Sequence, residues 1–366
     1  MPTLRAHGID LFELTMSILH TPLKVGALTL PNRIVMSPLT RCRSAAGRVP
    51  TPLMAEYYRQ RSGAGLIVSE ATSVDPMGVG YPDTPGIWSR EQVEGWKGVT
   101  RAVHEAGGRI FLQLWHVGRV SHPFYLDGRQ PVAPSALAVP DRVRLLRPPE
   151  PYPVPRALEL SELPAVVEAY RVGAQHAQEA GFDGVELHGA NGYLLDQFLQ
   201  DGSNKRTDSY GGPVENRARL LLETVDAAIS VWGADRVGVH LAPRGDAQGM
   251  GDSNPAATFG YVARELARRR IAFLFTREGI QGRARLTPDL KRIFGGVVIA
   301  NEAFTAEQAE QELASGSADA VAWGKLFIAN PDLPVRLRAK APLNEPDPTT
   351  FYGGSEKGYI DYPALA

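Results

Sequence analysis

Residues 181–195 read G-F-D-G-V-E-L-H-G-A-N-G-Y-L-L, an apolar run that ends in polar side chains. The part up to Leu187 is short, apolar and bounded by glycine, as expected for a β-strand buried on both faces. His188, Asn191 and Tyr193 then follow within six residues. The stretch therefore predicts a buried strand with three hydrogen-bonding side chains at its carboxyl end, and that placement needs an explanation.

Seven further runs of this kind alternate with amphipathic segments along the chain. Segments such as 91–106 and 258–269 space their apolar residues as helices do. Strand and helix repeated eight times predict parallel strands with crossover helices, and eight units favour closure into a (β/α)8 TIM barrel. An open doubly wound sheet is the alternative, although no G-x-G-x-x-G follows the first strand. The expected strands are 33–40, 65–72, 108–116, 181–188, 236–243, 271–278, 295–301 and 318–325.

Several segments exceed a minimal barrel. Residues 1–17 are expected to be an N-terminal extension, and residues 18–366 a single barrel domain. Residues 22–31 predict a small hairpin over the N-terminal end of the barrel. Residues 118–160 form a long proline-rich insertion after the third strand, and prolines disfavour both helix and central strand. Insertions of this length are often lids or mobile loops, and residues 341–366 predict an irregular tail.

Composition narrows the class of protein. The chain has 366 residues, 43% of them apolar, and a net charge of −1, so no overall field attracts nucleic acid or a membrane surface. We find no apolar run of about 18 residues that could cross a bilayer. The polar N-terminus does not resemble a signal peptide, which makes the cytoplasm the expected location. A single cysteine, Cys42, excludes an internal disulfide and a cysteine-ligated iron–sulfur cluster, and we expect a packed thiol there.

TIM barrels build their active sites at the carboxyl ends of their strands. Each polar residue at such an end has a structural alternative: Thr40 could fill strand volume, Gln113 could be a satisfied core amide, and His188 could bond a loop carbonyl. Their common placement favours a shared function instead. The residues at the predicted strand ends are Thr40, Glu70, Ala71, Thr72, Gln113, Trp115, His116, His188, Asn191, Tyr193, His240, Arg277, Asn301, Gly324 and Lys325.

Six motifs resemble those of the old yellow enzymes. They are S-P-L-T-R (37–41), Q-L-W-H (113–116), H-G-A-N-G-Y-L-L (188–195), N-K-R-T-D-S-Y-G-G-P-V-E-N-R-A-R (204–219), I-A-N-P-D-L (328–333) and the ending F-Y-G-G (351–354) with K-G-Y-I-D-Y-P (357–363). The resemblance runs from about Leu19 to the C-terminus and implies an FMN-dependent ene reductase on a (β/α)8 barrel. It also implies tightly but non-covalently bound FMN and a preference for NADPH over NADH. Thr40, where some relatives carry cysteine, resembles the branch of the pentaerythritol tetranitrate and N-ethylmaleimide reductases.

The resemblance implies a role for each matching residue. His188 and Asn191 would donate to the substrate oxygen and stabilise the charge that develops on it. Tyr193, with an ordinary pKa near 10, would give a proton to the α carbon. The substrate pocket would contain Tyr81, Trp115, Gln248 and Tyr352. The FMN contacts would be Pro38, Leu39, Thr40, Ala71, Gln113, His240, Asn301, Gly324 and Lys325.

The chain departs from the family pattern at the flavin. Relatives usually carry arginine where this chain has His240 and Lys325. A histidine near the flavin would make its reduction more dependent on pH, unless water or Arg244 takes over the contact. Lysine loses the two-pronged contact that arginine makes with phosphate, and Glu302 adds a negative charge nearby, so weaker retention of FMN is expected.

Two other classes of protein remain open. A metal-dependent barrel hydrolase could draw ligands from His188 and His240 on neighbouring strands, although the first strand offers no H-x-H. A flavoprotein sensor that has lost its catalysis is the non-enzymatic alternative. For the enzyme, no metal is expected and the partner is a small molecule: an enone, enal, maleimide, nitroalkene or nitrate ester. The sequence does not choose among these or between a monomer and a homodimer.

Overall fold

The computed structural model describes residues 17–245, 247–282 and 284–365. The predicted N-terminal extension, residues 1–17, lies outside the described residues except for Ser17. In this part of the chain, eight parallel strands form a barrel, and pairing of the last with the first closes it. Each strand overlaps a predicted range, so the predicted TIM barrel is confirmed. The strands are β3 (Ile34–Met36), β4 (Leu66–Val68), β6 (Ile110–Trp115), β9 (Gly184–Gly189), β10 (Val237–Leu241), β11 (Phe273–Arg277), β12 (Val298–Asn301) and β13 (Ala320–Trp323). A short strand, β5 (Thr72–Ser73), continues the pairing along β6.

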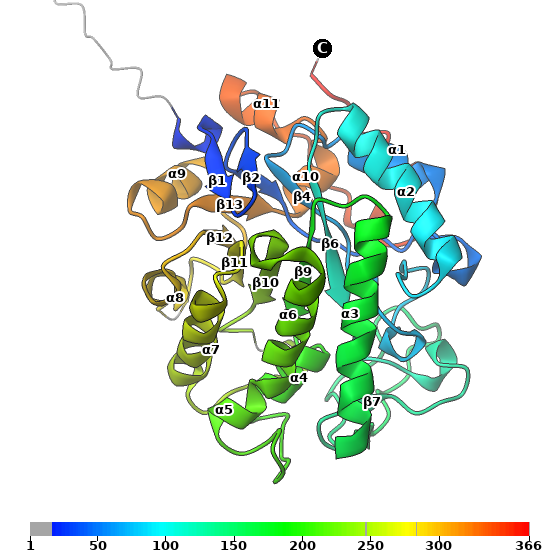
Figure 1. Ribbon diagram of the computed structural model, residues 1–366. Helices are drawn as coiled ribbons and strands as arrows, with labels where there is room; N and C mark the ends of the chain where they lie inside the picture. The colour runs from blue at the N-terminus through cyan, green and yellow to red at the C-terminus, as the bar shows by residue number, and fades with distance from the viewer. Residues whose placement is uncertain (1–16, 246, 283, 366) are drawn as a thin grey trace, which may run out of the picture.

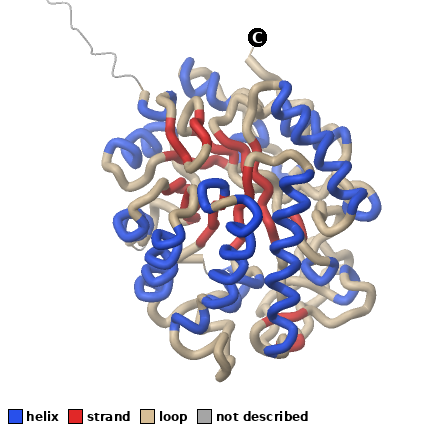
Figure 2. The backbone as a smooth tube through the Cα atoms, viewed as in Figure 1, coloured by secondary structure: helices blue, strands red, loops and turns tan. Residues whose placement is uncertain are grey.

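Helices surround the barrel, as Figures 1 and 2 show. Side-chain caps fix several helix starts: the Thr51 and Asn254 side chains each accept from the backbone three residues on, and Ser89 and Thr305 form capping boxes. None of the described helices has the length and apolar character needed to cross a membrane. The helices are α1 (Pro52–Arg59), α2 (Arg90–Glu105), α3 (Leu163–Glu179), α4 (Leu194–Leu199), α5 (Val214–Arg217), α6 (Arg219–Trp232), α7 (Pro255–Arg269), α8 (Thr287–Phe294), α9 (Ala306–Ala314), α10 (Lys325–Ala329) and α11 (Leu333–Ala339).

Alternation along the strands separates the two sides of the barrel wall. On β6 and β9, Leu112 and Val185 belong to the large core that includes the helices, while Phe111 belongs to the smaller core inside the barrel. The residues two apart therefore share a face, as the period of a strand requires. Gln113 and Glu186 follow the inward positions of the same two strands and put polar groups above this apolar interior.

The predicted hairpin is present. β1 (Leu23–Val25) and β2 (Leu28–Leu30) pair in antiparallel fashion. Val25 and Leu30 pack against the apolar side chains inside the barrel, and the amide of Ala27 donates to the Asp235 carbonyl at 2.9 Å. Asp235 precedes β10, so the hairpin closes the N-terminal end of the barrel, at the top in Figure 1.

The insertion of residues 118–160 forms a folded layer at the opposite end, near β7 in Figure 1. Two short strands, β7 (Val132–Ala133) and β8 (Arg156–Ala157), pair with each other within it. Its buried side chains join residues of the predicted substrate pocket in one apolar cluster, so the insertion builds a wall of the barrel mouth. The cluster contains Ala71, Tyr81, Trp115, Val117, Val120, Val139, Val143, Leu146 and Tyr152.

Three arginines fix the C-terminal tail through its backbone carbonyl groups. Arg41 donates to the carbonyls of Phe351 and Gly358 at 2.9 and 2.8 Å, and Arg43 and Arg61 bond further carbonyls of the tail. The ring of Tyr359 stacks on Tyr57 with centroids 4.1 Å apart. This anchoring holds the irregular tail, predicted over residues 341–366, against the barrel. Cys42, beside Arg41, is buried as predicted.

Two glycines inside the barrel make room for a pair of phenyl rings. A Cβ atom on Gly238 would lie 2.2 Å from Cζ of Phe273, and one on Gly184 would lie 2.4 Å from Cζ of Phe111. The two rings are themselves 5.6 Å apart. The interior is therefore filled at this level, and no side chain fits at either glycine.

We predict that Gly238→Ala lowers the free energy of unfolding by about 2 kcal/mol or more, because a packed core cannot absorb the added methyl group. Gly98→Ala is the matched control. A Cβ atom on Gly98, in α2, would meet nothing within 4 Å, and alanine in a helix interior stabilises by about 0.5–1 kcal/mol. Urea unfolding of both variants measures the difference. Equal midpoints for Gly238→Ala and the unmodified protein would contradict this account of the interior.

Candidate active site

Two histidines face each other at the carboxyl ends of β9 and β10. The parallel register pairs the Cα atoms of His188 and His240, and their rings stack with centroids 5.2 Å apart at 9°. Both are buried. Phe275 of β11 contacts the outer side of the His240 ring, with centroids 4.5 Å apart. The register alone therefore brings the two predicted residues together.

Both imidazoles are neutral near neutral pH. Burial lowers the pKa of His188 to about 3, and the positive charge of Arg277 adds to the shift. Burial also lowers the pKa of His240 well below its ordinary value, with further contributions from His188 and Arg277. The predicted pH dependence of flavin reduction would therefore require the bound cofactor to raise the pKa of His240 substantially, and it stays a prediction.

Gln113 determines which nitrogen of His240 carries the proton. Its side-chain NH2 lies 2.7 Å from Oε2 of Glu186 and 3.2 Å from Nδ1 of His240. An NH2 group only donates, so Nδ1 of a neutral His240 accepts and its Nε2 holds the hydrogen. Nε2 is buried and has no hydrogen-bond partner among the described residues. It is therefore a donor available to a bound molecule.

Glu186 is a buried carboxyl group that sequence reasoning missed. It is fully buried, and burial raises its pKa to about 8 despite the hydrogen bond from Gln113. It is therefore an uncharged acid at neutral pH, two residues before His188 on the same face of β9. A glutamate inside an otherwise apolar strand was the signal that could have revealed it.

The turn after β9 carries Asn191 and Tyr193 and is held by two buried side chains. Asp196 accepts from the amide of Gly192 at 2.8 Å. Gln197 donates to the carbonyls of Gly192 and Val117, at 2.7 and 2.9 Å, and so joins this turn to the start of the insertion. Sequence reasoning also missed these two, although a polar pair inside the apolar stretch 193–199 could have indicated them.

Tyr193 lies between the histidine and the aromatic wall. Its ring is 5.0 Å from the rings of both His188 and Trp115, edge to face. Its hydroxyl lies 2.9 Å from that of Tyr81. Burial raises the pKa of Tyr193 to about 12, so it keeps its proton at neutral pH. The predicted proton donor and two of the predicted pocket residues, Tyr81 and Trp115, therefore meet beside His188.

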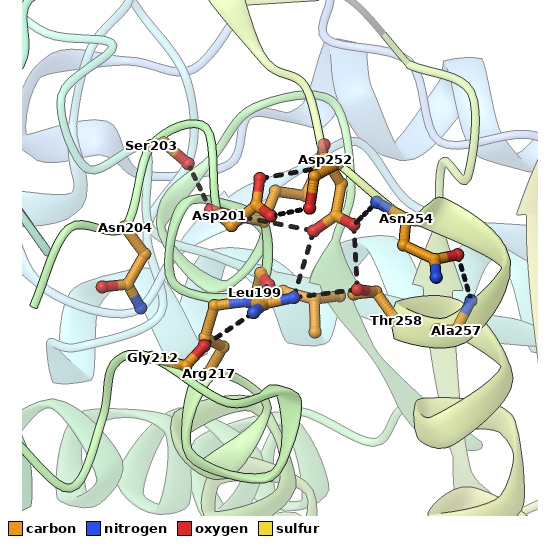
Figure 3. A network of polar contacts seen from close by, with 12 residues as sticks. Leu199, Asp201, Ser203, Asn204, Gly212, Arg217, Asp252, Asn254, Ala257 and Thr258 are labelled. Carbon is orange, nitrogen blue, oxygen red and sulfur yellow. Dashed lines mark hydrogen bonds and ion pairs between the residues drawn. The ribbon is translucent and has the colours of Figure 1, made fainter.

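Gln248 stands on a loop that a buried ion pair fixes, shown in Figure 3. Asp252 accepts from the amide of Asn254 and the hydroxyl of Thr258, and it pairs with Arg217 at 3.3 Å. Arg217 in turn donates to the carbonyls of Leu199 and Gly212 at 2.9 and 2.7 Å. The network joins the loop after β10 to the segment between α4 and α6.

The insertion reaches the same loop through Arg119. Its guanidinium donates to the Gln248 carbonyl at 3.1 Å and to the Leu137 carbonyl at 3.1 Å. The predicted pocket residue Tyr352 is different, because it stands on the tail with 54% of its surface exposed. Tyr352 is near enough to Tyr193 to influence its pKa, so it belongs to the rim of the mouth rather than to its interior.

The ends of β3, β12 and β13 form the other side of the mouth. Pro38, Leu39 and Thr40 are partly exposed there, and Ala71 is buried nearby. A Cβ atom on Gly324 would lie 3.1 Å from Cδ2 of Leu39, so the end of β3 and the start of α10 are in close contact. Lys325, the first residue of α10, is exposed.

Asn301 has a structural task that the sequence did not reveal. Its side-chain NH2 donates to Oγ of Ser37 at 2.8 Å and to the Ala322 carbonyl at 2.7 Å. Both hydrogens are used, so Asn301 ties β12 to β13 and β3. Its side-chain NH2 therefore makes both of its hydrogen bonds within the barrel wall.

The groups around the mouth fit the FMN that the resemblance implies. The Nε2–H of His240 and the indole N–H of Trp115 are buried donors without partners among the described residues. Lys325 supplies a cation at the end where phosphate is expected. Glu302 is an unfavourable charge there, but it forms an ion pair with Arg277. Arg244, the alternative to His240 for the contact with the flavin, is paired with Glu278 at 3.1 Å.

The hydrolase alternative lacks a set of metal ligands. Across the ranges that the structure describes, no group of three histidine, cysteine, aspartate or glutamate side chains is arranged to hold a metal ion. A catalytic zinc site needs about three protein ligands. Among the described residues, no third ligand therefore joins His188 and His240 to form a zinc site.

Comparison with known proteins identifies the family. The model of the NADH:flavin oxidoreductase / NADH oxidase family matches residues 18–344. A putative 12-oxophytodienoate reductase 2 of Oryza sativa subsp. japonica is 44% identical over 94% of this chain and 93% of its own length. A probable flavin mononucleotide-dependent alkene reductase of Leishmania infantum is 42% identical over 96% of this chain and 98% of its own.

Solved structures agree with this assignment. An old yellow enzyme homologue from Zymomonas mobilis superposes with a TM-score of 0.93 at 47% identity, covering 95% of this chain and 99% of the other. Morphinone reductase in complex with tetrahydroNAD gives 0.92 at 51% identity, covering 95% and 98%. With this fold, these relatives and these strand-end residues, the chain belongs to the NADH:flavin oxidoreductase / NADH oxidase family, as an FMN-dependent ene reductase of the old yellow enzyme group.

Proposed function

We propose that this enzyme reduces activated alkenes, such as enones, enals, maleimides and nitroalkenes, with NADPH as the source of electrons. The observation that carries the proposal is the convergence of His188, Asn191 and Tyr193 after one strand, beside an aromatic wall. Two residues that can donate hydrogen bonds and one protonated phenol are the groups that such a reduction requires. Morphinone reductase, a similar protein, has been solved with tetrahydroNAD, so NADH is the competing reductant.

His188 and Asn191 bind the substrate oxygen in this proposal. The side-chain NH2 of Asn191 always donates, and a neutral His188 donates from whichever ring nitrogen holds its hydrogen. Negative charge develops on a carbonyl or nitro oxygen when hydride adds at the β carbon. Buried donors fixed before the reaction stabilise that charge without reorganising. The low pKa of His188 keeps this donor uncharged at every physiological pH.

Tyr193 supplies the proton to the α carbon. Its pKa of about 12 keeps it protonated at neutral pH, and its bond to Tyr81 holds the hydroxyl beside the aromatic wall. Tyr81 is itself buried, and burial raises its pKa well above the ordinary value. The proton therefore comes from a neutral acid whose orientation is fixed by a second phenol.

FMN, when bound, would supply the hydride that it takes from NADPH. We propose that Pro38, Leu39, Thr40, Ala71 and Gln113 line its ring, and that His240 donates from Nε2 to an acceptor on the ring edge. Gly324 and Lys325 would bind the phosphate, and Asn301 would support them through the strands that it joins. The uncharged Glu186 keeps a negative charge away from the ring below about pH 8.

Substrate choice would depend on the aromatic cluster between the insertion and the barrel. Trp115 and Tyr81 stack with centroids 5.5 Å apart, and Arg119 holds the backbone carbonyl of Gln248. Flat conjugated molecules fit such walls. Nitro compounds and nitrate esters offer an oxygen to the same two donors, and we include them among the candidate substrates.

The first prediction concerns the complete cycle. We expect the purified protein to contain FMN, to lose its flavin absorbance when NADPH is added without oxygen, and to regain it on addition of 2-cyclohexenone. The measurement is an anaerobic absorbance titration, repeated with NADH. A flavin that NADPH and NADH both fail to reduce would favour the sensor. A protein that does not bind FMN would contradict the proposal.

The second prediction isolates the proton donor. Tyr193→Phe should slow reduction of 2-cyclohexenone about a hundredfold, because a positioned acid contributes at least that much, and should leave reduction of the flavin by NADPH nearly unchanged. Stopped-flow absorbance separates the two halves of the reaction. Tyr125→Phe, an edge tyrosine of the same cluster, is the control. Equal losses in both halves would argue against a role for Tyr193 in proton transfer.

The third prediction concerns pH. His188 and Tyr193 change charge only near pH 3 and 12, so the step that reduces the enone should be flat from pH 5 to about 7, below the range in which Glu186 ionises. Glu186 loses its proton above about pH 8, which puts a negative charge beside Gln113 and His240. The rate at which NADPH reduces the flavin should therefore fall above pH 8. Glu186→Gln should remove that fall, and a fall that persists in this variant would exclude Glu186 as its cause.

A further inference from the structure

Arg277 ends β11 and reaches across the mouth of the barrel. Its Nη1 donates to Oδ1 of Asn191 at 3.0 Å, and its Nε forms an ion pair with Glu302. The three side chains come from the ends of β9, β11 and β12, so this contact joins separate strands. The sixth predicted strand ends at Arg277, but the family motifs gave this residue no role.

The order of the strands fixes where the guanidinium lies. β10 stands between β9 and β11 in the barrel. A hydrogen bond from Arg277 to Asn191 must therefore pass over the carboxyl end of β10, where His240 is placed. The positive charge is accordingly close to both imidazoles, and it contributes to lowering the pKa of His188 and of His240.

The contact also fixes the orientation of the Asn191 amide. A guanidinium has five N–H donors and no acceptor, so only the amide oxygen can face it. The amide is planar, and its NH2 group therefore points away from Arg277. Asn191 itself has a φ of 59°, a left-handed backbone conformation that asparagine adopts more readily than most residues. Backbone and side chain are thus both held in one arrangement.

Glu302 completes the arrangement from the other side. Its φ of 116° is rare for any residue other than glycine. Such a conformation persists only where the surroundings hold it, and it is often found at functional sites. Here the ion pair with Arg277 is one such contact. Glu302, Arg277 and Asn191 line one cavity of about 340 Å³, which Ala242 and Gly279 also border.

We propose that Arg277 is a positioning residue for the substrate oxygen. By holding Oδ1 of Asn191, it keeps the amide NH2 turned toward the oxygen of the bound acceptor, and Glu302 holds Arg277 in place. This inference rests on the proposed function, in which Asn191 and His188 share that oxygen. Arg277 acts through Asn191 and does not touch the reacting atoms.

The test uses the FMN-loaded, oxidised protein and cyclohexanone, a ketone that carries the oxygen but no reducible C=C bond. Binding is followed by the change in flavin absorbance, so no turnover is needed. We expect Arg277→Met to raise the Kd about tenfold, the scale of a lost hydrogen bond to a charged group. Arg277→Lys should raise it less, since lysine keeps one donor and the charge. The matched control is Arg292→Met, which removes an exposed arginine paired with Asp289 on α8.

A double-mutant cycle decides whether Arg277 acts through Asn191. In the Asn191→Ala background, Arg277→Met should cause no further loss of binding, because the amide that it orients is gone. Equal losses with and without the amide would overturn the inference. An unchanged Kd in Arg277→Met, with weakened binding in Asn191→Ala, would overturn it and leave the proposed function standing.

An unchanged Kd in Asn191→Ala would remove both the oxygen-binding role of Asn191 and the inference about Arg277. FMN content and thermal unfolding are measured for every variant. If Arg277→Met loses FMN, Arg277→Lys carries the same cycle, since the positive charge beside Glu302 remains. Additive effects of Arg277→Lys and Asn191→Ala would then overturn the inference.

Discussion

Parallel pairing of β9 with β10 sets His188 opposite His240, and a shift of one strand by one residue would turn its histidine out of the barrel. The inward column of β9 then carries Glu186 below His188, and the turn that follows carries Asn191 and Tyr193. Every other part of the site is arranged around this pair of strands. β6 contributes Gln113 and Trp115 from one side, and β11 contributes Arg277 from the other.

Burial leaves most of the polar groups at the mouth uncharged near neutral pH. Burial disfavours the charged form of each group. It therefore lowers the pKa of His188 and of His240 and raises the pKa of Glu186. Arg277 and Glu302 form a charged pair at the partly exposed rim. The arrangement offers hydrogen-bond donors without a fixed charge in the interior, which suits a reaction in which charge develops only transiently.

Much of this architecture was predictable from the sequence. Runs of apolar, β-branched residues identified the strands because parallel strands are buried on both faces, and His188, Asn191 and Tyr193 were found because polar residues after such runs are unusual. Residues that act on other residues were missed. Asp196 and Gln197 bond backbone groups from neighbouring loops. Arg277 was placed at a strand end, but its contact with a side chain 86 positions away was not predicted, because only the closed barrel brings the two together. The buried face of the helix α3 includes the small residues Gly173, Ala174 and Ala177. The apolar stripe of this helix is therefore weak, and its sequence indicates a helix less clearly.

The anchoring of the C-terminal tail has a consequence for how the enzyme can diverge. Arg41, Arg43 and Arg61 bind main-chain carbonyl groups, which every amino acid provides. Gly353, Gly354 and Gly358 must stay glycine because their φ angles are positive. The exposed side chain of Tyr352, by contrast, can be exchanged without loss of these contacts, provided that the backbone keeps its path. The fold thus separates the attachment of the tail from the side chain that the tail presents to entering molecules.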